Sequence, residues 1–546
     1  MDNSNSNSWQ NPPLFRGRIV KATYREQKIL DYQRNPLIEA LSPIWSKQEV
    51  IDLLQHYPDY QEEYRTWAVE LRLHLIRRVL KFFEVLPRHI DLEQRISCTL
   101  RTGYESRNPC GPEVWHNIRD KIEALKSQLS PQQEVGAEDI LATTSLQGDP
   151  EMAATGFAFV GISGIGKTTS LNKILACYPQ VIIHSRYHDE DFNHVQIVWI
   201  KLQCPFDGSC KGLCLNFFQA LDSLLGTHYY ENYGRRGRAT VDEMLPNMAR
   251  VSLLHSIGIL VIDEIQHLSE AKSGGARRML NFLVQLVNTV GMPVIPVGTY
   301  KAIPILGSEF RQARRSAGQG DLFWYAMQED ETWQLFLESL WMYQYTKTPC
   351  PLTPELSHTL YDVSQGITDL AVKVYMLAQI RAITRGDDES ITEALIRSVA
   401  YDSLRLANPI LEALRSGNIL DLQKVDDVLP IDIEPFIQEV LKNYNAKSEP
   451  NPSSTASETH QDEAKKPEQQ AGTTTDNAPG QKRRSGSSVG AKGSQRSTKG
   501  AAAKPQGNLL EAVSQEIKKN GTAYDVLQKA GYFKPTGENL SKDGAQ

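Results

Sequence analysis

The stretch that most constrains this chain is Gly161 to Thr168, which reads Gly-Ile-Ser-Gly-Ile-Gly-Lys-Thr. It fits the pattern G-x-x-x-x-G-K-[ST], in which backbone N–H groups surround phosphates, the lysine reaches the β- and γ-phosphates, and the hydroxyl holds Mg²⁺. The pattern needs a strand before it and a helix after it. Phe157–Val160 is a short apolar run, and residues 167–176 have apolar side chains at helical spacing. We therefore expect a phosphate-binding loop, rather than a glycine-rich turn without a ligand, formed by Gly161, Ser163, Gly164, Ile165, Gly166, Lys167, Thr168 and Thr169.

Length and composition narrow the remaining possibilities. A chain of 546 residues is too long for one core, so two or three folded units with linkers are expected. The net charge of −6 means that any contact with nucleic acid must come from local basic patches. No apolar run approaches the roughly 20 residues that span a bilayer, and the start lacks the charged and apolar regions of a signal peptide. We expect a cytoplasmic protein with no membrane partner.

The cysteines do not indicate a disulfide framework, because their number is odd and they are scattered along the chain. One group is denser, consisting of Cys204, Cys210 and Cys214 with His194 upstream. Only Cys210 and Cys214 have the close spacing of a zinc-ligand pair. Buried or loop thiols are therefore favoured over a metal site.

The region after the loop alternates short apolar runs with helical segments, which predicts an α/β fold with a parallel sheet covered on both faces. Helices Leu213–Leu225 and Ala276–Val290 are expected as crossovers. This pattern, followed by helices over 332–342, 354–364, 370–385 and 392–406, predicts a P-loop NTPase core with a helical lid. The expected strands are Phe157–Val160, Val181–His184, Val195–Leu202, Ile257–Ile262, Val294–Val297 and Leu322–Met327.

Five segments are predicted from these patterns. Residues 1–130 form a helical N-terminal region that contacts a partner or DNA, with a helix over Gln61–Phe83 and a cation-rich stretch over Phe15–Lys28. Residues 131–330 hold the α/β core, and 331–445 hold the lid and the helices after it. Residues 446–505 are poor in apolar side chains and are expected to be disordered. Residues 506–546 regain helical periodicity, as expected of a short docking module.

Three further residues, at the ends of two predicted strands, point to nucleotide hydrolysis. The apolar run Ile259–Ile262 leads directly into Asp263 and Glu264. A carboxylate at the end of a buried parallel strand lies beside the loop, so Asp263 can hold Mg²⁺ with Thr168 while Glu264 polarises the attacking water. Thr299 follows the next strand, and its hydroxyl is expected to report on the γ-phosphate or to position that water.

Arginines and a lid position complete the predicted nucleotide site. Arg311, Arg314 and Arg315 follow Thr299, and an arginine supplied by a neighbouring subunit would stabilise the transition state of phosphoryl transfer. Arg314 and Arg315 are favoured over Arg311, and a solvated basic helix face is the alternative. At the start of the lid's third helix, where related ATPases carry a phosphate-touching arginine, the chain has Asp369. The nearest cation is Lys373, one turn further on, and it is the candidate for a phosphate contact from the lid.

The order of these motifs resembles the AAA+ superfamily, particularly its initiator-like branch. The amino-acid sequence of several short runs is similar to that of the TnsC family, the ATP-dependent regulators of Tn-seven-type transposons. The resemblance covers residues 20–420, and the tail beyond 446 does not match. The runs that carry it are Pro179–His184, Leu215–Asp222, Val261–Leu268, Ser273–Gly275, Met279–Leu283 and Arg314–Gly318 in the core, and Tyr32–Leu41, Arg101–Tyr104, Arg107–Pro109 and Leu411–Gly417 outside it.

The resemblance implies that ATP, with Mg²⁺, drives assembly of a ring-like or helical homo-oligomer around double-stranded DNA. This assembly would join a target-selecting protein to the transposase, and hydrolysis would dismantle it. Duplex DNA can be gripped through its phosphates by lysine and arginine without base readout. The candidates for those contacts are Lys201, Lys211, Arg235, Arg236 and Arg238, followed by Lys272, Arg277 and Arg278.

Two other functions stay open at this point. An initiator-like or clamp-loader-like ATPase in DNA replication would carry the same motifs. A signalling scaffold that holds its nucleotide and rarely turns it over would share the loop, although Glu264 argues against it.

Overall fold

The computed structural model describes residues 17–110, 156–235, 238–270, 291–306, 320–386 and 388–416, with isolated positions between 280 and 287 and at 437 and 438. The chain divides into two units, residues 1–454 and 455–546, and every described residue belongs to the first. The predicted linker and docking module, 446–505 and 506–546, lie outside the described residues, as does most of the expected helix Ala276–Val290.

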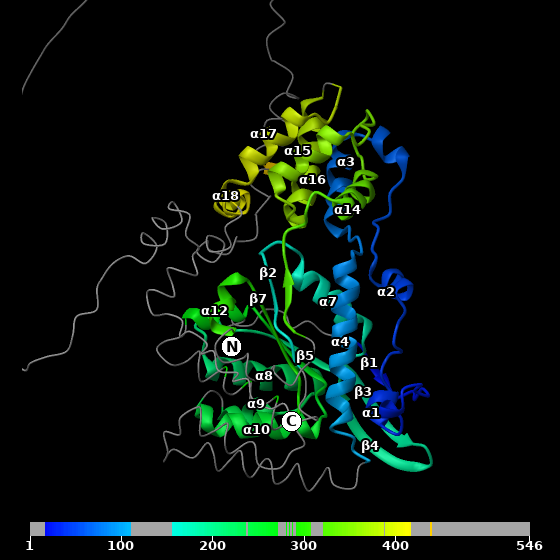
Figure 1. The fold of residues 1–546 in the computed structure, drawn as a ribbon, viewed down its shortest axis with the longest axis vertical. Helices are drawn as coiled ribbons and strands as arrows, with labels where there is room; N and C mark the ends of the chain where they lie inside the picture. Colours follow the sequence, from blue (N-terminus) through cyan, green and yellow to red (C-terminus); the bar gives the residue numbers. More distant parts are fainter. Residues whose placement is uncertain are drawn as a thin grey trace, which may run out of the picture. The chain divides into compact units, whose positions relative to one another are not determined.

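A five-stranded parallel sheet forms the centre of the fold, as the alternation of strands and helices predicted (Figure 1). Its spatial order is β5-β6-β7-β2-β8. Because neighbours in the sheet are not neighbours in the chain, helices must cross over between the strands. The strands are β2 (Phe159–Gly161), β5 (Trp199–Gln203), β6 (Ile259–Asp263), β7 (Val294–Gly298) and β8 (Leu322–Trp324).

Both faces of this sheet are covered, which explains why its strands are mostly apolar. The charged and amide side chains among them are Lys201 and Gln203 of β5 and Asp263 at the end of β6. In β6, Leu260 and Ile262 pack in one core cluster, whereas Ile259 and Val261 pack in a second cluster on the opposite face. The first cluster includes side chains of α8 and α10, and the second includes side chains of α4 and α7. The bounds are α4 (Pro87–Glu105), α7 (Lys167–Cys177), α8 (Cys210–Leu225) and α10 (Val241–Leu254).

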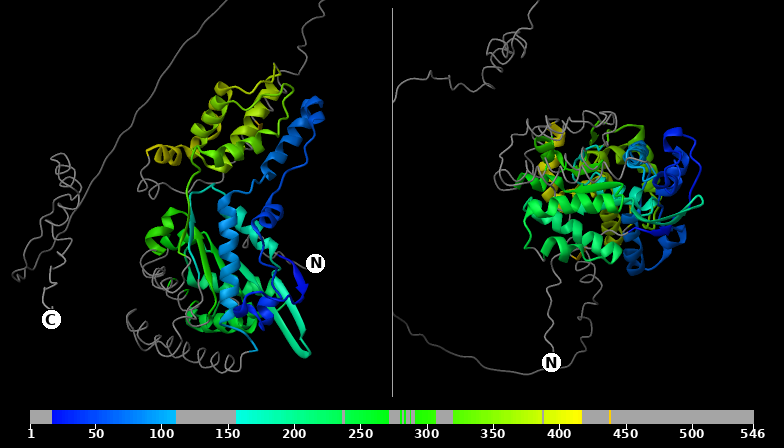
Figure 2. Two further views of the ribbon diagram at one scale, coloured as in Figure 1. Left: turned by 45° about the vertical axis from the view of Figure 1, so that its right-hand side comes forward. Right: turned by 90° about the horizontal axis from the view of Figure 1, so that it is seen from below.

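Two runs that were predicted as strands of the parallel sheet form other strands in the structure. The run Val195–Leu202 is divided at Val198 between β4 (Glu190–Ile197) and β5. The run Val181–His184 belongs to β3 (Val181–Tyr187), which pairs antiparallel with β4 and parallel with β1 (Ile19–Lys21) in a separate three-stranded sheet. In the two-residue turn between β3 and β4, His188 has φ 51°, a conformation that favours glycine or asparagine. Because the sequence has histidine at this position, the hairpin was not predicted. Figure 2 shows this hairpin extending beyond the neighbouring helices.

The N-terminal region is mostly helical, as predicted, but Gln61–Phe83 is not one helix. It is broken into the 3₁₀ turn η2 (Glu62–Thr66), α3 (Val69–Leu75) and the 3₁₀ segment η3 (Ile76–Lys81). The predicted cation-rich stretch Phe15–Lys28 contributes β1, so part of it completes a sheet of the core. The remaining elements of this region are η1 (Leu30–Tyr32), α1 (Pro36–Glu39) and α2 (Lys47–Leu54).

The helical lid follows β8, and its helices begin within two residues of the predicted positions. Asp330, Thr353 and Thr392 each accept a hydrogen bond from a backbone N–H of the first turn, which fixes three of the starts. Figure 1 shows α3 beside these helices, and α3 and η3 both contact α16. The lid helices are α14 (Glu331–Trp341), α15 (Pro354–Ser364), α16 (Thr368–Arg385) and α17 (Glu393–Ser403), followed by η10 (Arg405–Ala407) and α18 (Asn408–Ser416).

Among the residues that the structure describes, every helix is too short or too polar to cross a lipid bilayer.

Short helical elements connect the longer strands and helices of the core. The connecting elements are α9 (Tyr229–Gly234), η6 (Ile265–Glu270), η8 (Tyr300–Ala302) and α12 (Ile303–Ile305).

Candidate nucleotide-binding site

The predicted phosphate loop joins the end of β2 to the start of α7. Gly164 and Gly166 have φ angles of 79° and 91°, in the left-handed region that glycine enters without a steric penalty. Gly166 is the cap residue of α7 and has no side chain to bond the first N–H groups of the helix. Those N–H groups and the positive end of the helix dipole form an anion site.

Lys167 is the first residue of α7, and its side chain is folded back over the loop. Its Nζ donates to the carbonyl oxygens of Gly161 and Ile162, each at 2.8 Å. The residue is 9% exposed, so its ammonium group is kept close to the loop. A phosphate held by the loop would lie within reach of this charge.

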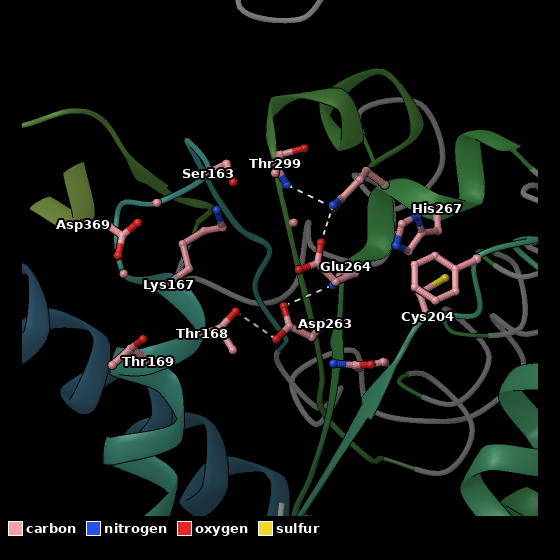
Figure 3. A pocket seen from close by; sticks show the side chains of 16 residues that line it. Ser163, Lys167, Thr168, Thr169, Cys204, Asp263, Glu264, His267, Thr299 and Asp369 are labelled. Carbon is pink, nitrogen blue, oxygen red and sulfur yellow. Dashed lines mark hydrogen bonds between the residues drawn. The ribbon is translucent and has the colours of Figure 1, made fainter. Parts of the chain in front are cut away.

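A cavity of about 470 Å³ opens in front of the loop (Figure 3). Its volume lies within the range of small-molecule sites. The predicted residues that line it are Ser163, Gly164, Gly166, Lys167, Thr168, Thr169, Asp263, Glu264 and Thr299. The prediction did not include Gln203, Cys204, Phe206, Gln266, His267, Gly298 and Asp369, which line it too.

Asp263 and Thr168 meet at the floor of this cavity. The Thr168 hydroxyl donates to Oδ2 of Asp263 over 3.0 Å, and the Glu264 N–H donates to Oδ1 over 3.1 Å (Figure 3). Asp263 is 2% exposed. A carboxylate and a hydroxyl are the hard oxygen ligands that Mg²⁺ takes in phosphate sites, so this pair fits the metal.

Glu264, Gln266 and Thr299 form a connected group beside that pair. The Gln266 amide N–H donates to the Glu264 carboxylate, and its oxygen accepts the Thr299 backbone N–H over 3.2 Å. The Thr299 N–H fixes which end of the amide is the oxygen, because it can only donate. The Thr299 hydroxyl is buried and has no hydrogen-bond partner among the described residues. A ligand atom in the cavity would satisfy it.

A second cavity, of about 140 Å³, adjoins the first at Gly164, Gly166, Thr169 and Asp369. Its walls come from three parts of the chain: the N-terminal segment 80–89, the phosphate loop, and the lid. Phe82, Leu86, Ile165, Phe336 and Val372 give it an apolar lining. A nucleoside triphosphate whose phosphates contact the loop could place its base here. The prediction had put Ile165 in the nucleotide site, and it lines this second cavity.

Two nitrogen-bearing side chains stand in the wall of the second cavity. Burial lowers the pKa of His89 to about 3, so its ring is neutral near pH 7. Its Nδ1 accepts the Leu86 N–H over 2.8 Å, which leaves the ring proton on Nε2. Burial also lowers the pKa of Arg88 to about 10, and its guanidinium lies 4.9 Å from the ring centre of Trp324. The wall therefore offers neutral and cationic donors beside apolar surface.

The lid contributes Asp369 rather than Lys373 to the phosphate cavity. The Asp369 N–H donates to the Gly164 carbonyl over 3.3 Å, so the first turn of α16 rests on the loop. Lys373 is one turn further along and forms an ion pair with Asp369 at 2.7 Å. Lys373 does not line the cavity. The prediction that Lys373 itself contacts phosphate is therefore not supported by this arrangement.

Among the residues predicted to contact DNA, Lys201 is buried inside the protein. Its side chain is 7% exposed, and its Nζ lies 2.9 Å from Oδ2 of Asp263 inside the protein. It cannot reach DNA phosphates from there, because its side chain is buried and its ammonium group is held by Asp263. Lys211 lies in the first turn of α8, and Arg235 and Arg238 are exposed near the start of α10. Arg236, Lys272, Arg277, Arg278, Arg311, Arg314 and Arg315 lie outside the described residues.

The dense cysteine group does not come together with His194. Burial raises the pKa of Cys204 and of Cys214 to about 12, so both thiols are protonated near pH 7. Within the described residues, no three histidine, cysteine or acidic side chains are grouped as a metal site. The His194 Nε2 instead pairs with the Ser256 hydroxyl at 3.0 Å.

The chain is similar in fold to several solved structures. The sequences of curated proteins give no match. Among solved structures, the chain is similar to the Orc1 protein of Aeropyrum pernix in complex with DNA, with 13% identity and a TM-score of 0.33 over 60% of this chain and 82% of that one. It is also similar to a Walker-type ATPase of Pyrococcus abyssi, with 15% identity and a TM-score of 0.30 over 58% of this chain and 93% of that one.

The segment that holds the phosphate loop also matches a protein family. Residues 152–306 match the family described as AAA domain. This segment holds β2, the phosphate loop, α7 and the strands that end at Asp263 and Gly298. The match therefore covers every residue that lines the phosphate cavity except Asp369, and the segment 152–306 is an AAA domain with a P-loop fold.

Proposed function

We propose that this protein is a Mg²⁺-dependent ATPase. The observation that carries the proposal is the meeting of Lys167, Thr168, Asp263 and Glu264 in one cavity at the carboxyl ends of parallel strands. A nucleotide-binding scaffold would need only the first three. Glu264 adds a carboxylate that can take a proton from water.

The residues would divide the work of hydrolysis as follows. The N–H groups of the loop and the Lys167 ammonium bind the β- and γ-phosphates, while Thr168 and Asp263 hold Mg²⁺, which supplies positive charge at the phosphate oxygens. Glu264 accepts a proton from the water that attacks the γ-phosphorus, and the bond to the bridging β–γ oxygen breaks. The Thr299 hydroxyl, which lacks a partner among the described residues, would form a hydrogen bond with the γ-phosphate or with the attacking water.

The second cavity supports a nucleotide rather than a simple phosphate ester as the substrate. It adjoins the phosphate cavity at four residues, and aromatic and aliphatic side chains line it. A flat heteroaromatic base is a suitable occupant for a narrow apolar space with a few donors. We take the base to be adenine, in keeping with the family resemblance of the sequence.

We further propose that ATP binding controls assembly of the protein on double-stranded DNA during transposition. The support for this part is the similarity of the quoted runs to TnsC. In this proposal the ATP-bound chains form a ring or helix on DNA, bridge a target-selecting protein and the transposase, and come apart after hydrolysis. Arg314 and Arg315, with Arg311 as the alternative, would reach the γ-phosphate of the neighbouring subunit, and Lys211, Arg235 and Arg238 remain candidate DNA contacts.

A Glu264→Gln variant tests the core of the proposal. The amide keeps the size of the side chain but cannot accept the proton, so turnover should fall by about 100-fold or more while ATP still binds. ATP binding is followed with a fluorescent analogue, and phosphate release gives the turnover. Lys167→Ala is the matched control, since it should lose nucleotide binding as well. Unchanged turnover in Glu264→Gln would show that Glu264 is not the base.

A further inference from the structure

Lys201 lies in an unusual place for a lysine, beneath the floor of the phosphate cavity. It is the third residue of β5, and its ammonium group contacts one side chain at the end of β6 and one of α7. The Nζ is 2.9 Å from Oδ2 of Asp263 and donates to the Asn172 side-chain oxygen over 2.8 Å. Lys201 itself does not line the cavity. Its ammonium therefore contacts a carboxylate that lines the cavity, although Lys201 is itself shielded from that cavity.

The carboxylate that Lys201 contacts is the one we propose as a magnesium ligand. Oδ2 of Asp263 receives both the Lys201 ammonium and the Thr168 hydroxyl, and Oδ1 receives the Glu264 N–H. Both side chains of the ion pair are at least nine-tenths buried. In such surroundings a charge is weakly screened, so a cation bound at Asp263 would interact strongly with the lysine.

We propose that Lys201 is a built-in counter-cation of the magnesium site and sets how much Mg²⁺ the protein needs to bind its nucleotide tightly. This inference rests on the proposed function. Lys201 shares one carboxylate with the metal, so it weakens the attraction between Asp263 and Mg²⁺. The same charge balances Asp263 when Mg²⁺ is scarce, which permits nucleotide to bind before the metal does.

The arrangement fits this role better than that of a simple hydrogen-bond donor. A neutral side chain could satisfy the Asn172 and Asp263 oxygens, but only a cation changes the charge that Mg²⁺ meets. Asn172 holds the ammonium with an uncharged oxygen, so the Asp263 carboxylate is the one anionic partner of Lys201 among the described residues. The charge of Lys201 is thus directed at the metal site and not shared with another acid.

The test is a Mg²⁺ titration of the full-length protein with a fluorescent ATP analogue as the probe. Three chains are compared: the natural chain, Lys201→Met, which removes the charge, and Lys201→Arg, which keeps it. Lys201→Gln is a second neutral variant that retains a donor, in case Lys201→Met does not fold. Thermal unfolding of each chain in EDTA and in Mg²⁺, without nucleotide, is the second measurement.

Removing the charge should lower the Mg²⁺ concentration at half-maximal nucleotide affinity by about tenfold or more, whereas Lys201→Arg should stay within about threefold of the natural chain. The neutral variants should also be less stable in EDTA and gain more from Mg²⁺ than the natural chain does. An unchanged or higher Mg²⁺ requirement in a folded neutral variant would overturn the proposal. A natural chain that binds no nucleotide at any Mg²⁺ concentration would instead overturn the proposed function.

Discussion

At the scale of single residues, the backbone of Glu264 determines what the site can do. Successive side chains of a strand point to opposite faces, so a continued β6 would turn Asp263 and Glu264 away from each other. Glu264 instead has φ 59°, in the left-handed region that non-glycine residues rarely occupy. Both carboxylates consequently line the same cavity. Strain of this kind is retained where the surrounding contacts hold it, and here Gln266 supplies such a contact.

Gln266 is the residue that we expect to position the base. Its amide joins the Glu264 carboxylate to the backbone N–H of Thr299, at the end of the neighbouring strand. Gln266→Leu should therefore lower kcat by about 10-fold to 100-fold, since a small displacement of a reacting group is that costly. The KM for ATP should change little, because the loop and Lys167 bind the phosphates. Steady-state kinetics with a thermal unfolding control measure both.

A second variant separates positioning by Gln266 from general damage to the fold. A methyl group on Gly298 would lie 2.7 Å from the Gln266 side-chain oxygen and 2.8 Å from Cγ2 of the buried Ile265, so Gly298→Ala should displace the amide and reduce kcat, with some loss of stability. Gln266→Glu keeps an acceptor for the Thr299 N–H but places a second carboxylate beside Glu264. Its kcat should therefore also be lower than that of the natural chain. Normal kcat in a folded Gln266→Leu protein would contradict the positioning role.

At the scale of elements, the N-terminal segment and the lid are joined by a buried ion pair. Arg72 of α3 has a fully buried side chain and contacts Glu389, which precedes α17, at 2.5 Å and 2.8 Å. The guanidinium also donates to the carbonyl oxygens of Trp67 and Tyr345. These contacts tie α3 to the lid, while α4 packs against the sheet.

This ion pair shows where prediction from the sequence ends. The loop and the Asp263–Glu264 pair could be found because each lies within a few consecutive residues, and the lid helices because their period and caps are local. Arg72 and Glu389 are 317 positions apart, and the prediction of one helix over Gln61–Phe83 gave Arg72 no partner. Lys201 was similarly placed on a DNA surface. Its partner lies on the adjacent strand β6. In the register of the two strands Lys201 is opposite Val261, and its long side chain reaches Asp263 two residues further along.

Removing Arg72 should destabilise the protein strongly. In Arg72→Met, the buried Glu389 carboxylate loses its main charge partner, and the free energy of unfolding should fall by about 3–5 kcal/mol. The double variant Arg72→Met, Glu389→Gln should recover part of that loss, because no buried charge is then unpaired. Chemical denaturation at pH 7 measures both. A single variant as stable as the natural chain would contradict this account.

The contribution of this pair should also depend on pH. Burial alone would raise the pKa of Glu389, but hydrogen bonds and charge from Arg72 and Lys347 lower it. Because the folded pKa is depressed, the stabilisation is present above the ordinary glutamate pKa of about 4.3 and is lost as pH falls through the lower, folded value. The stability difference between the natural chain and Glu389→Gln should therefore be constant near neutral pH and shrink in acid. A difference that grows in acid would contradict the sign of the shift.

At the scale of the whole molecule, the nucleotide site draws on segments that the sequence presents as separate regions. The second cavity takes its walls from residues 80–89, from the loop, and from α14 and α16 of the lid. A bound base would contact all of them at once. Nucleotide binding can thus fix the N-terminal segment and the lid against the core. The faces that those segments present to another subunit would then depend on the nucleotide, which is the property that an ATP-controlled assembly requires.

Mixing two inactive variants tests whether subunits complete one another's sites. Glu264→Gln keeps its arginines but lacks the base, and a chain with Arg314→Ala and Arg315→Ala keeps the base but lacks those arginines. In an equimolar mixture with ATP and non-specific duplex DNA, head-to-tail contacts would give roughly a quarter of the junctions an intact base and an intact arginine. ATP turnover should therefore reappear in the mixture although each variant alone is inactive. The same mixture made with an added Arg311→Ala change in the Glu264→Gln chain should recover equally if Arg314 or Arg315 is the residue that acts. No recovery, with both variants folded and assembled on DNA, would mean that these arginines do not act across the junction.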